Sequence, residues 1–202
     1  MTSKDHETTP PRKASTEATT TSSPPTIEAP GVDLDYFSFV ELAGRRLDEE
    51  IPDNDSGANR VILTLSRAAS QIVYDLEASV HRPNGHSWAS FRLMFVLWLA
   101  GPMESGRTAS LAGMSRAAVS NLANTLTSRG LLRKVPGTAD RRAITLSLTK
   151  SGLDEVQAAF REQNQRETLW VSSLTPIEQQ LLIMLLEKMM GHRDIVGARS
   201  RQ

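Results

Sequence analysis

The chain has 202 residues, of which 39% are apolar and 23% are charged, so it is long enough for one globular domain with a buried core. Its 23 basic and 23 acidic residues cancel, which excludes a uniformly cationic protein. The absence of cysteine excludes disulfide bonds, thiolate metal sites and cysteine-based catalysis or redox sensing.

The first 30 residues differ in composition from the rest of the chain. Seventeen of them are Ser, Thr or Pro, and none is aromatic. Such a segment buries too little apolar surface to offset its ordering entropy, so we expect a disordered tail, either passive or carrying a phosphorylation or docking site. The N-terminus lacks the apolar core of a signal peptide, and no run of 18 apolar residues occurs in the sequence. We therefore expect a cytoplasmic protein without a membrane partner.

Three helices are predicted before residue 101. Apolar residues recur at spacings of three and four over about 33–48 and 58–82, which is typical of amphipathic helices. The helix that follows is apolar on nearly all sides from Trp88 to Trp98, so we expect it at the centre of the core.

A helix-turn-helix is predicted next. A short helix over 108–112 leads into the turn Gly113-Met114. Ser115 is a suitable N-cap for a second helix, whose buried stripe would be Val119, Leu122 and Leu126 and which would end before Gly130. A helix, a tight turn with glycine and a capped helix together form this DNA-binding motif.

A β-hairpin follows the second helix of this motif. Its strands are residues 131–135 and 143–148, where Ile144, Leu146 and Leu148 alternate onto one face, and residues 136–142 form its loop. The loop arginines are consistent with a mobile surface loop. Alternatively, they reach a narrow minor groove, whose negative potential attracts arginine, with Asp140 pairing with Arg142.

Two further helices are predicted near the C-terminus, over about 151–172 and from Thr175 onward. Thr175, Pro176 and Glu178 form a helix start with a capping box. The apolar stripe from Leu181 to Met189 is too wide for a lone surface helix. It indicates a partner helix, contributed by a second subunit or by another part of the chain.

Positive charge is concentrated in one segment. Residues 107–150 hold eight basic residues and one acid, a net charge of +7, while the remainder of the chain from residue 31 onward carries −6. Solvated surface charge usually alternates in sign, so this concentration indicates a polyanion partner.

The second helix of the motif has a face without carboxylates. Its side chains are small or hydrogen-bonding, and no acid occurs between residues 107 and 139. Asn can pair with adenine and Arg with guanine, whereas Ala and Ser allow close approach to a thymine methyl group. A merely solvated helix face would ordinarily include Asp or Glu, so we interpret this face as a contact with double-stranded DNA.

The run ASLAGMSRAAVSNLANTLTSRGLLRKV, followed by ADRRAITLSLTKSG, resembles the winged helix-turn-helix of MarR-family transcriptional regulators. The similarity covers about residues 58–191, and the Asp-x-Arg wing followed by LT-x-x-G is its most specific part. The resemblance implies an obligate homodimer that represses or activates genes from a pseudo-palindromic operator. By position, Arg142 would enter the minor groove with Asp140 as its partner. The residues expected to contact DNA are Ser115, Arg116, Ala117, Ser120, Asn121, Asn124, Asp140, Arg141 and Arg142.

The predicted fold class is mainly α with a small β-hairpin wing, a winged helix-turn-helix flanked by N- and C-terminal dimerisation helices. The expected organisation is a tail over 1–30, an N-terminal extension helix within 31–57, a helical core contributing to the dimer and a ligand pocket over 58–104, a DNA-binding lobe over 105–150, dimerisation helices over 151–192 and a flexible tail over 193–202. The extension departs from the usual family pattern and would enlarge the dimer interface or cover the pocket.

The resemblance also implies regulation by a small molecule, which in this family is often a phenolic or aromatic acid. Because the chain lacks cysteine, we expect such a ligand rather than an oxidant as the signal. The candidate ligand contacts are Tyr74, Trp88 and Arg92. His86 lies in the same part of the sequence. The alternative to a ligand site is that Trp88 belongs to the core and His86 to a loop.

Other classes of function have less support. The sequence has no Gly-rich phosphate loop and no nucleophile elbow, and its histidines lack metal-ligand spacing, so we expect neither an enzyme nor a bound cofactor or metal. The alternative to a DNA-binding regulator is a winged-helix module whose basic face docks an acidic protein.

Overall fold

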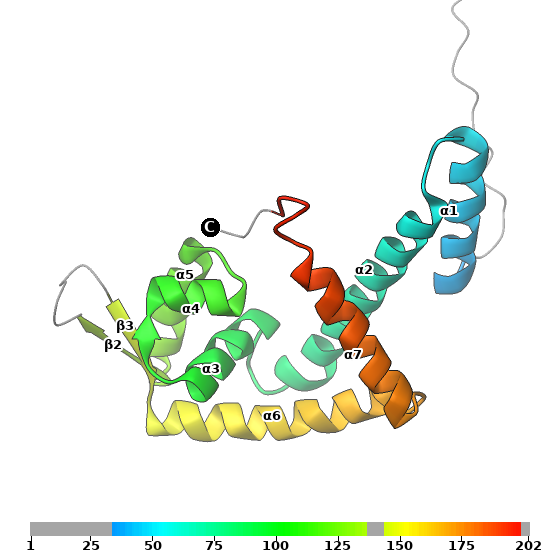
Figure 1. Ribbon diagram of the computed structural model, residues 1–202. Helices are drawn as coiled ribbons and strands as arrows, with labels where there is room; N and C mark the ends of the chain where they lie inside the picture. Colours follow the sequence, from blue (N-terminus) through cyan, green and yellow to red (C-terminus); the bar gives the residue numbers. More distant parts are fainter. Residues whose placement is uncertain (1–33, 137–143, 199–202) are drawn as a thin grey trace, which may run out of the picture.

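The computed structural model describes residues 34–136 and 144–198 (Figure 1). The predicted tail over 1–30 and most of the predicted wing loop lie outside these ranges. The elements in chain order are α1 (Tyr36–Glu50), α2 (Ser56–Leu76), the π-helical turn η1 (Glu77–His81), α3 (Trp88–Ala100), β1 (Met103–Glu104), α4 (Ser105–Ala112), α5 (Arg116–Ser128), β2 (Leu132–Pro136), β3 (Ile144–Leu148), α6 (Lys150–Val171) and α7 (Pro176–Gly191).

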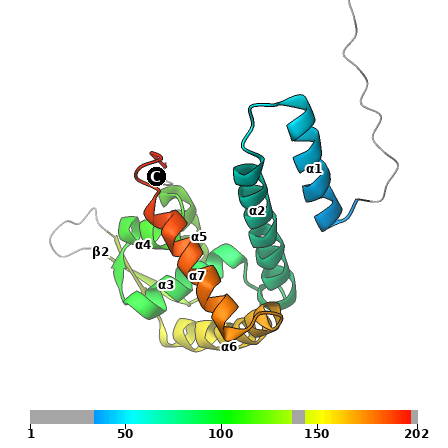
Figure 2. The same ribbon diagram turned by 45° about the vertical axis from the view of Figure 1, so that its right-hand side comes forward.

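The elements form a lobe with long helices leading away from it. Helices α3, α4 and α5 lie together with the sheet, and α6 runs from the sheet along this lobe to the joint with α7 (Figure 1). Helices α1 and α2 form a hairpin that projects away from the lobe (Figure 2). The predicted class, mainly α with a small β wing and a winged helix-turn-helix, is confirmed.

The sheet has one strand more than the predicted hairpin. Strands β2 and β3 pair antiparallel, with Leu132 opposite Leu148, and β1 adds to the other side of β3, so the order is β1-β3-β2. Met103 of β1 pairs with Leu146, and both side chains are buried. Of the three residues predicted to share a buried face, Leu146 is buried, Leu148 is partly buried and Ile144 is 41% exposed.

Local capping sets where several helices begin. The side chain of Asp35 caps α1, that of Ser87 caps α3, and the predicted capping box of Thr175 and Glu178 is present at α7. In each case the cap oxygen accepts a backbone N–H that would otherwise have no partner in the first turn.

Helix α3 lies at the centre of the core, as predicted. Phe91, Leu93, Met94 and Leu97 are buried against residues of α4, α5, β2, β3 and α6.

Near the C-terminal end of α6, the carboxylate of Asp75 on α2 accepts two hydrogen bonds from Arg166, at Oδ1 (2.6 Å) and at Oδ2 (2.7 Å). Its Oδ2 also accepts the indole N–H of Trp170 at 2.7 Å. These hydrogen bonds hold the pKa of Asp75 well below its usual range and fasten α2 to α6.

Two buried histidines lie where η1 meets the lobe. His81 is fully buried and stacks on Phe91 with ring centroids 4.5 Å apart. His86 is also buried, and its Nε2 lies 2.7 Å from Oε1 of Glu155 on α6. The alternative of a loop position for His86 is correct for the backbone, but the side chain belongs to the interior.

The free energy of unfolding is expected to fall as the pH is lowered from about 7 to 5. Burial lowers the pKa of His81 and of His86, although Glu77 and Glu162 near His81, and Glu155 near His86, oppose this shift. The unfolded chain therefore binds protons below about pH 6.5 that the folded protein still excludes, and stability rises with pH wherever the unfolded state binds more protons.

Urea unfolding at pH 7 and at pH 5 measures this difference. His81→Phe should reduce the loss of stability between the two pH values, whereas His192→Asn, a change at an exposed position, should leave the loss unchanged. An equal loss in wild type and His81→Phe would contradict a contribution from His81.

Among the described residues, no single helix is both long and apolar enough to span a membrane, although α6 and α7 taken together meet the length and composition criteria. These two helices are bent by 103° at their junction.

Candidate nucleic-acid interface

The turn between α4 and α5 has the predicted helix-turn-helix geometry. Gly113 ends α4 with φ +60°, a left-handed conformation that disfavours other residues. The Arg92 guanidinium donates to the carbonyl of Ala112, also at this helix end. Ser115 then caps α5 by accepting the backbone N–H of Ala118 at 3.2 Å. Helix α4 begins at Ser105, three residues before the predicted start.

The predicted reading face of α5 is exposed. Val119, Ala123 and Leu126 are buried on the opposite side and fix the rotation of the helix. Ser115 is partly buried at the cap. The five side chains that the sequence assigns to the major groove beyond this cap are all exposed: Arg116, Ala117, Ser120, Asn121 and Asn124.

A hydrogen bond joins this face to the first strand of the wing. The ammonium group of Lys134 on β2 donates to Oδ1 of Asn124. Bidentate recognition of adenine needs both the oxygen and the NH₂ of an asparagine side chain. Asn124 therefore has only its NH₂ free of this bond, whereas the structure shows no hydrogen bond to the Asn121 side chain within the described residues.

Arg129 anchors the C-terminal end of α5 instead of extending its basic surface. Its guanidinium donates to Oε1 of Glu155 at 2.9 Å and to the carbonyl of Gly85 at 2.8 Å. Because the same Glu155 oxygen also contacts His86, one carboxylate connects α5, α6 and the loop after η1. No sequence signal indicates this pairing, because Glu155 lies 26 residues away and outside the basic segment.

The other basic side chains that the structure describes within residues 107–150 are less neutralised by carboxylates than Arg129 is. Lys150 pairs with Asp154 at 2.9 Å, but both side chains are largely exposed, so this pair contributes little. Arg107, Arg116 and Arg133 are exposed, and no carboxylate within 34–136 and 144–198 forms an ion pair with them. Exposed cations without an ion-paired carboxylate in these ranges therefore lie on α4, α5 and β2.

The predicted wing contacts Asp140, Arg141 and Arg142 lie outside the described residues. The structure describes the two strands that lead to them, β2 ending at Pro136 and β3 beginning at Ile144.

The three predicted ligand contacts have different surroundings. Tyr74 is 63% exposed on α2. Trp88 is partly buried and stacks near Phe91 with centroids 6.0 Å apart, which agrees with the alternative of a core position. The side chain of Arg92, a residue of α3, reaches the C-terminal end of α4. Their role as ligand contacts stays a prediction.

Comparison with known proteins identifies the family of this lobe. The model of the MarR family matches residues 87–144. An uncharacterized HTH-type transcriptional regulator of Bacillus subtilis, YwaE, is 32% identical over 128 residues, which are 63% of this chain and 75% of that protein.

Solved structures share the fold. BpsR of Bordetella bronchiseptica, whose DNA binding is regulated by 6-hydroxynicotinic acid, matches with a TM-score of 0.60 and 24% identity over 65% of this chain and 98% of its own. A mutant of MarR from E. coli, solved with operator DNA, matches with a TM-score of 0.59 and 19% identity over 71% of this chain and 96% of its own.

Proposed function

The chain belongs to the MarR family of transcriptional regulators, and from this premise we propose that it binds a pseudo-palindromic operator in double-stranded DNA as a homodimer under the control of a small molecule. Residues 105–150 form the DNA-binding lobe. The dimer is held by residues 151–192 together with part of 58–104.

One observation carries the DNA-binding proposal: the exposed face of α5 has no carboxylate and is flanked by cations that lack acidic partners among the described residues. Arg107, Arg116 and Arg133 are available for phosphates, and Asn121 for a base edge. In this proposal Arg142 of the wing enters the minor groove, Asp140 orients it and Arg141 contacts the backbone. MarR, a relative in fold, has been solved with operator DNA, which supports DNA as the partner proposed here.

The dimer proposal is supported by α7. This helix buries none of its residues within the protomer. Exposed apolar surface of this extent usually marks a protein interface, and two-fold homodimers are the commonest oligomers. The large apolar side chains exposed on it are Ile177, Leu181, Leu182, Ile183, Met184, Leu185, Met189 and Met190.

A dimer of this kind sets the operator geometry. The half-sites should be one helical turn apart, about 34–36 Å. Operator affinity should fall steeply with salt, with a slope of about −0.9 in log K against log salt for each phosphate neutralised.

Asn121→Ala is expected to reduce discrimination at one base pair of each half-site by about 1–3 kcal/mol, because a bidentate base contact is lost. Selection of bound fragments from a random DNA library gives the operator, and fluorescence anisotropy with single-base variants then measures the loss. Asn164→Ala on the exposed surface of α6 is the matched control and should change nothing.

If Asn121→Ala weakened binding equally on every DNA sequence, this would contradict the proposal that Asn121 reads a base. No binding of any DNA above about 100 mM salt, with an acidic protein partner recovered instead, would favour the protein-docking alternative.

Control by a small molecule has separate support. The DNA binding of BpsR is regulated by 6-hydroxynicotinic acid, and other relatives in fold were solved with ligands, NadR with 4-hydroxyphenylacetate and PcaV with its natural ligand.

A further inference from the structure

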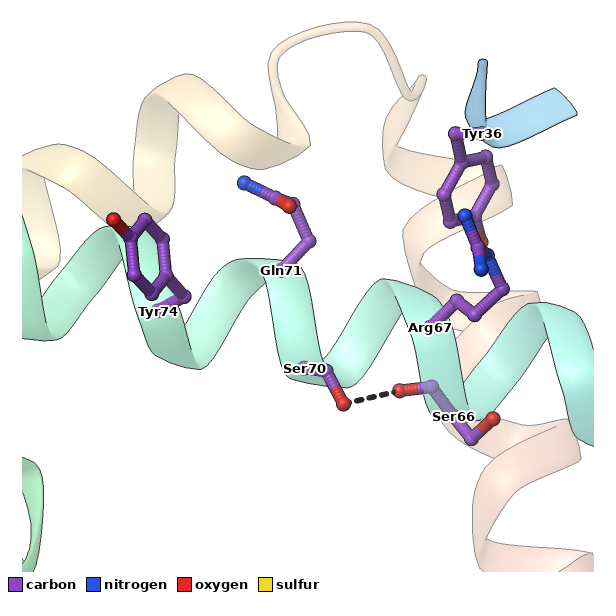
Figure 3. Close-up of a pocket in the computed structure, with 6 residues that line it drawn as sticks. All are labelled: Tyr36, Ser66, Arg67, Ser70, Gln71 and Tyr74. Atoms are coloured by element: carbon purple, nitrogen blue, oxygen red, sulfur yellow. Dashed lines mark hydrogen bonds between the residues drawn. The ribbon is translucent and has the colours of Figure 1, made fainter. Parts of the chain in front are cut away.

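A hollow of about 460 Å³ lies between α1 and α2 and opens to solvent (Figure 3). This volume lies within the range of small-molecule sites, about 300–1,000 Å³. Both helices precede residues 87–144, which the family model matches. The lining residues are Tyr36 of α1 and Ser66, Arg67, Ser70, Gln71 and Tyr74 of α2.

Arg67 is held in this hollow by aromatic rings. Its guanidinium carbon lies 4.9 Å from the centroid of the Tyr36 ring and 4.8 Å from that of Phe39. Figure 3 shows the guanidinium lying against Tyr36. The aromatic rings contact the faces of the guanidinium group. Because its N–H groups lie in its plane, they can still donate hydrogen bonds to an anion. No carboxylate of the described ranges pairs with Arg67, so its charge is uncompensated.

The position of α1 is fixed by hydrogen bonding as well as by these rings. The Tyr36 hydroxyl donates to the Thr64 carbonyl of α2 at 2.9 Å. Asp35 caps the start of α1 through the backbone N–H of Ser38 at 2.8 Å. The Tyr36 side of the hollow therefore has a defined geometry.

The residues that line the hollow indicate the chemical class of its ligand. The lining offers one cation, two tyrosine rings, an amide and two hydroxyl groups, and it has no acid. A single guanidinium fork matches a single carboxylate, and aromatic walls favour a flat ring. We propose that the hollow between α1 and α2 binds a small aromatic carboxylate, with Arg67, held by the Tyr36 ring, binding the carboxylate and the Tyr74 ring contacting the aromatic part.

Such a ligand would join α1 to α2, which continues through η1 into the lobe. An effect of the ligand on operator affinity therefore rests on the proposed function, whereas binding of the ligand does not.

Isothermal titration calorimetry of the full chain without DNA tests the site, with 4-hydroxybenzoate as the probe and the neutral 4-hydroxybenzamide as its comparison. We expect saturable binding of one carboxylate per chain and at least tenfold weaker binding of the amide. Arg67→Gln should weaken carboxylate binding at least tenfold and Arg67→Lys less. Arg60→Gln, an exposed arginine of the same helix outside the lining, should leave binding unchanged.

Circular dichroism establishes that each variant is folded, so lost binding is not lost structure. Equal binding by wild type and Arg67→Gln, or equal binding of the acid and the amide, would overturn the site. If the carboxylate binds as expected while the protein binds no DNA, the site stands and the proposed function fails.

Discussion

Replacing Gly152 by alanine is expected to lower the free energy of unfolding by about 3 kcal/mol, at the upper end of the usual cost of overpacking. A Cβ at this position would lie 2.1 Å from the carbonyl oxygen of Leu131 and 2.9 Å from its carbonyl carbon. Both are backbone atoms of a buried residue, so no side-chain rotation relieves the clash.

The surroundings of Gly152 leave little freedom to adjust. The backbone N–H of Gly152 donates to Oγ1 of Thr149 at 3.0 Å, and that hydroxyl donates to the Gly130 carbonyl at 2.7 Å. The backbone N–H of Thr149 also donates to the Leu131 carbonyl at 3.0 Å. Moving α6 away to admit a methyl group would break these bonds. The LT-x-x-G pattern is therefore the sequence signature of the joint between β3, α6 and the end of α5.

Equilibrium unfolding in urea, followed by circular dichroism, measures the effect. Gly106→Ala in α4 is the matched control, because a Cβ there meets nothing within 4 Å and helix propensity favours alanine by up to about 1 kcal/mol. Equal unfolding free energies for Gly152→Ala and wild type would show that the close approach to Leu131 is relieved at no cost.

The double variant Leu182→Glu, Leu185→Glu should convert the protein to a monomer and weaken operator binding at least 100-fold. Both side chains are nearly half exposed in the protomer, so the substitutions leave the protomer folded. In a two-fold dimer they would place four carboxylates in an apolar interface, where unpaired charge is strongly disfavoured. A monomer engages one half-site and loses the gain from linked binding, which is about 10²–10⁴-fold.

Sedimentation equilibrium and fluorescence anisotropy measure these two effects. Gln180→Glu adds a charge to the same helix at an exposed polar position and should preserve both the dimer and the affinity. A double variant that still forms dimers would show that α7 does not hold the subunits together.

Sequence reasoning succeeded where the determining interactions are local. The caps at Ser115 and Thr175 and the buried stripe of α5 depend on residues within a few positions of one another. It missed β1, because a strand of two residues is recognisable only through its partner Leu146, 43 residues later. The last turn of the predicted helix over 58–82 is π-helical, and apolar spacing does not distinguish this from a regular turn.

The exposed face of α5 could be predicted because it is the side opposite the apolar stripe. The contacts of α5 with other elements could not, because the bonds from Lys134 to Asn124 and from Arg129 to Glu155 join separate elements. The surroundings of Tyr74, Trp88 and Arg92 could not be predicted for a related reason. These residues are close in sequence, but α2 and α3 direct them to solvent, to the aromatic core and to the end of α4.

The ion pair between Arg129 and Glu155 couples α6 to the proposed DNA-reading helix α5. Helix α6 has 22 residues and is therefore about 33 Å long. A pivot of about 5° at its junction with α7 would move the opposite end by about 3 Å, and Glu155, which holds Arg129, by about 2 Å. These displacements are comparable to the rise of one base pair, about 3.4 Å. A small change in the angle between α6 and α7 would therefore shift the proposed reading helix by a large part of one base step.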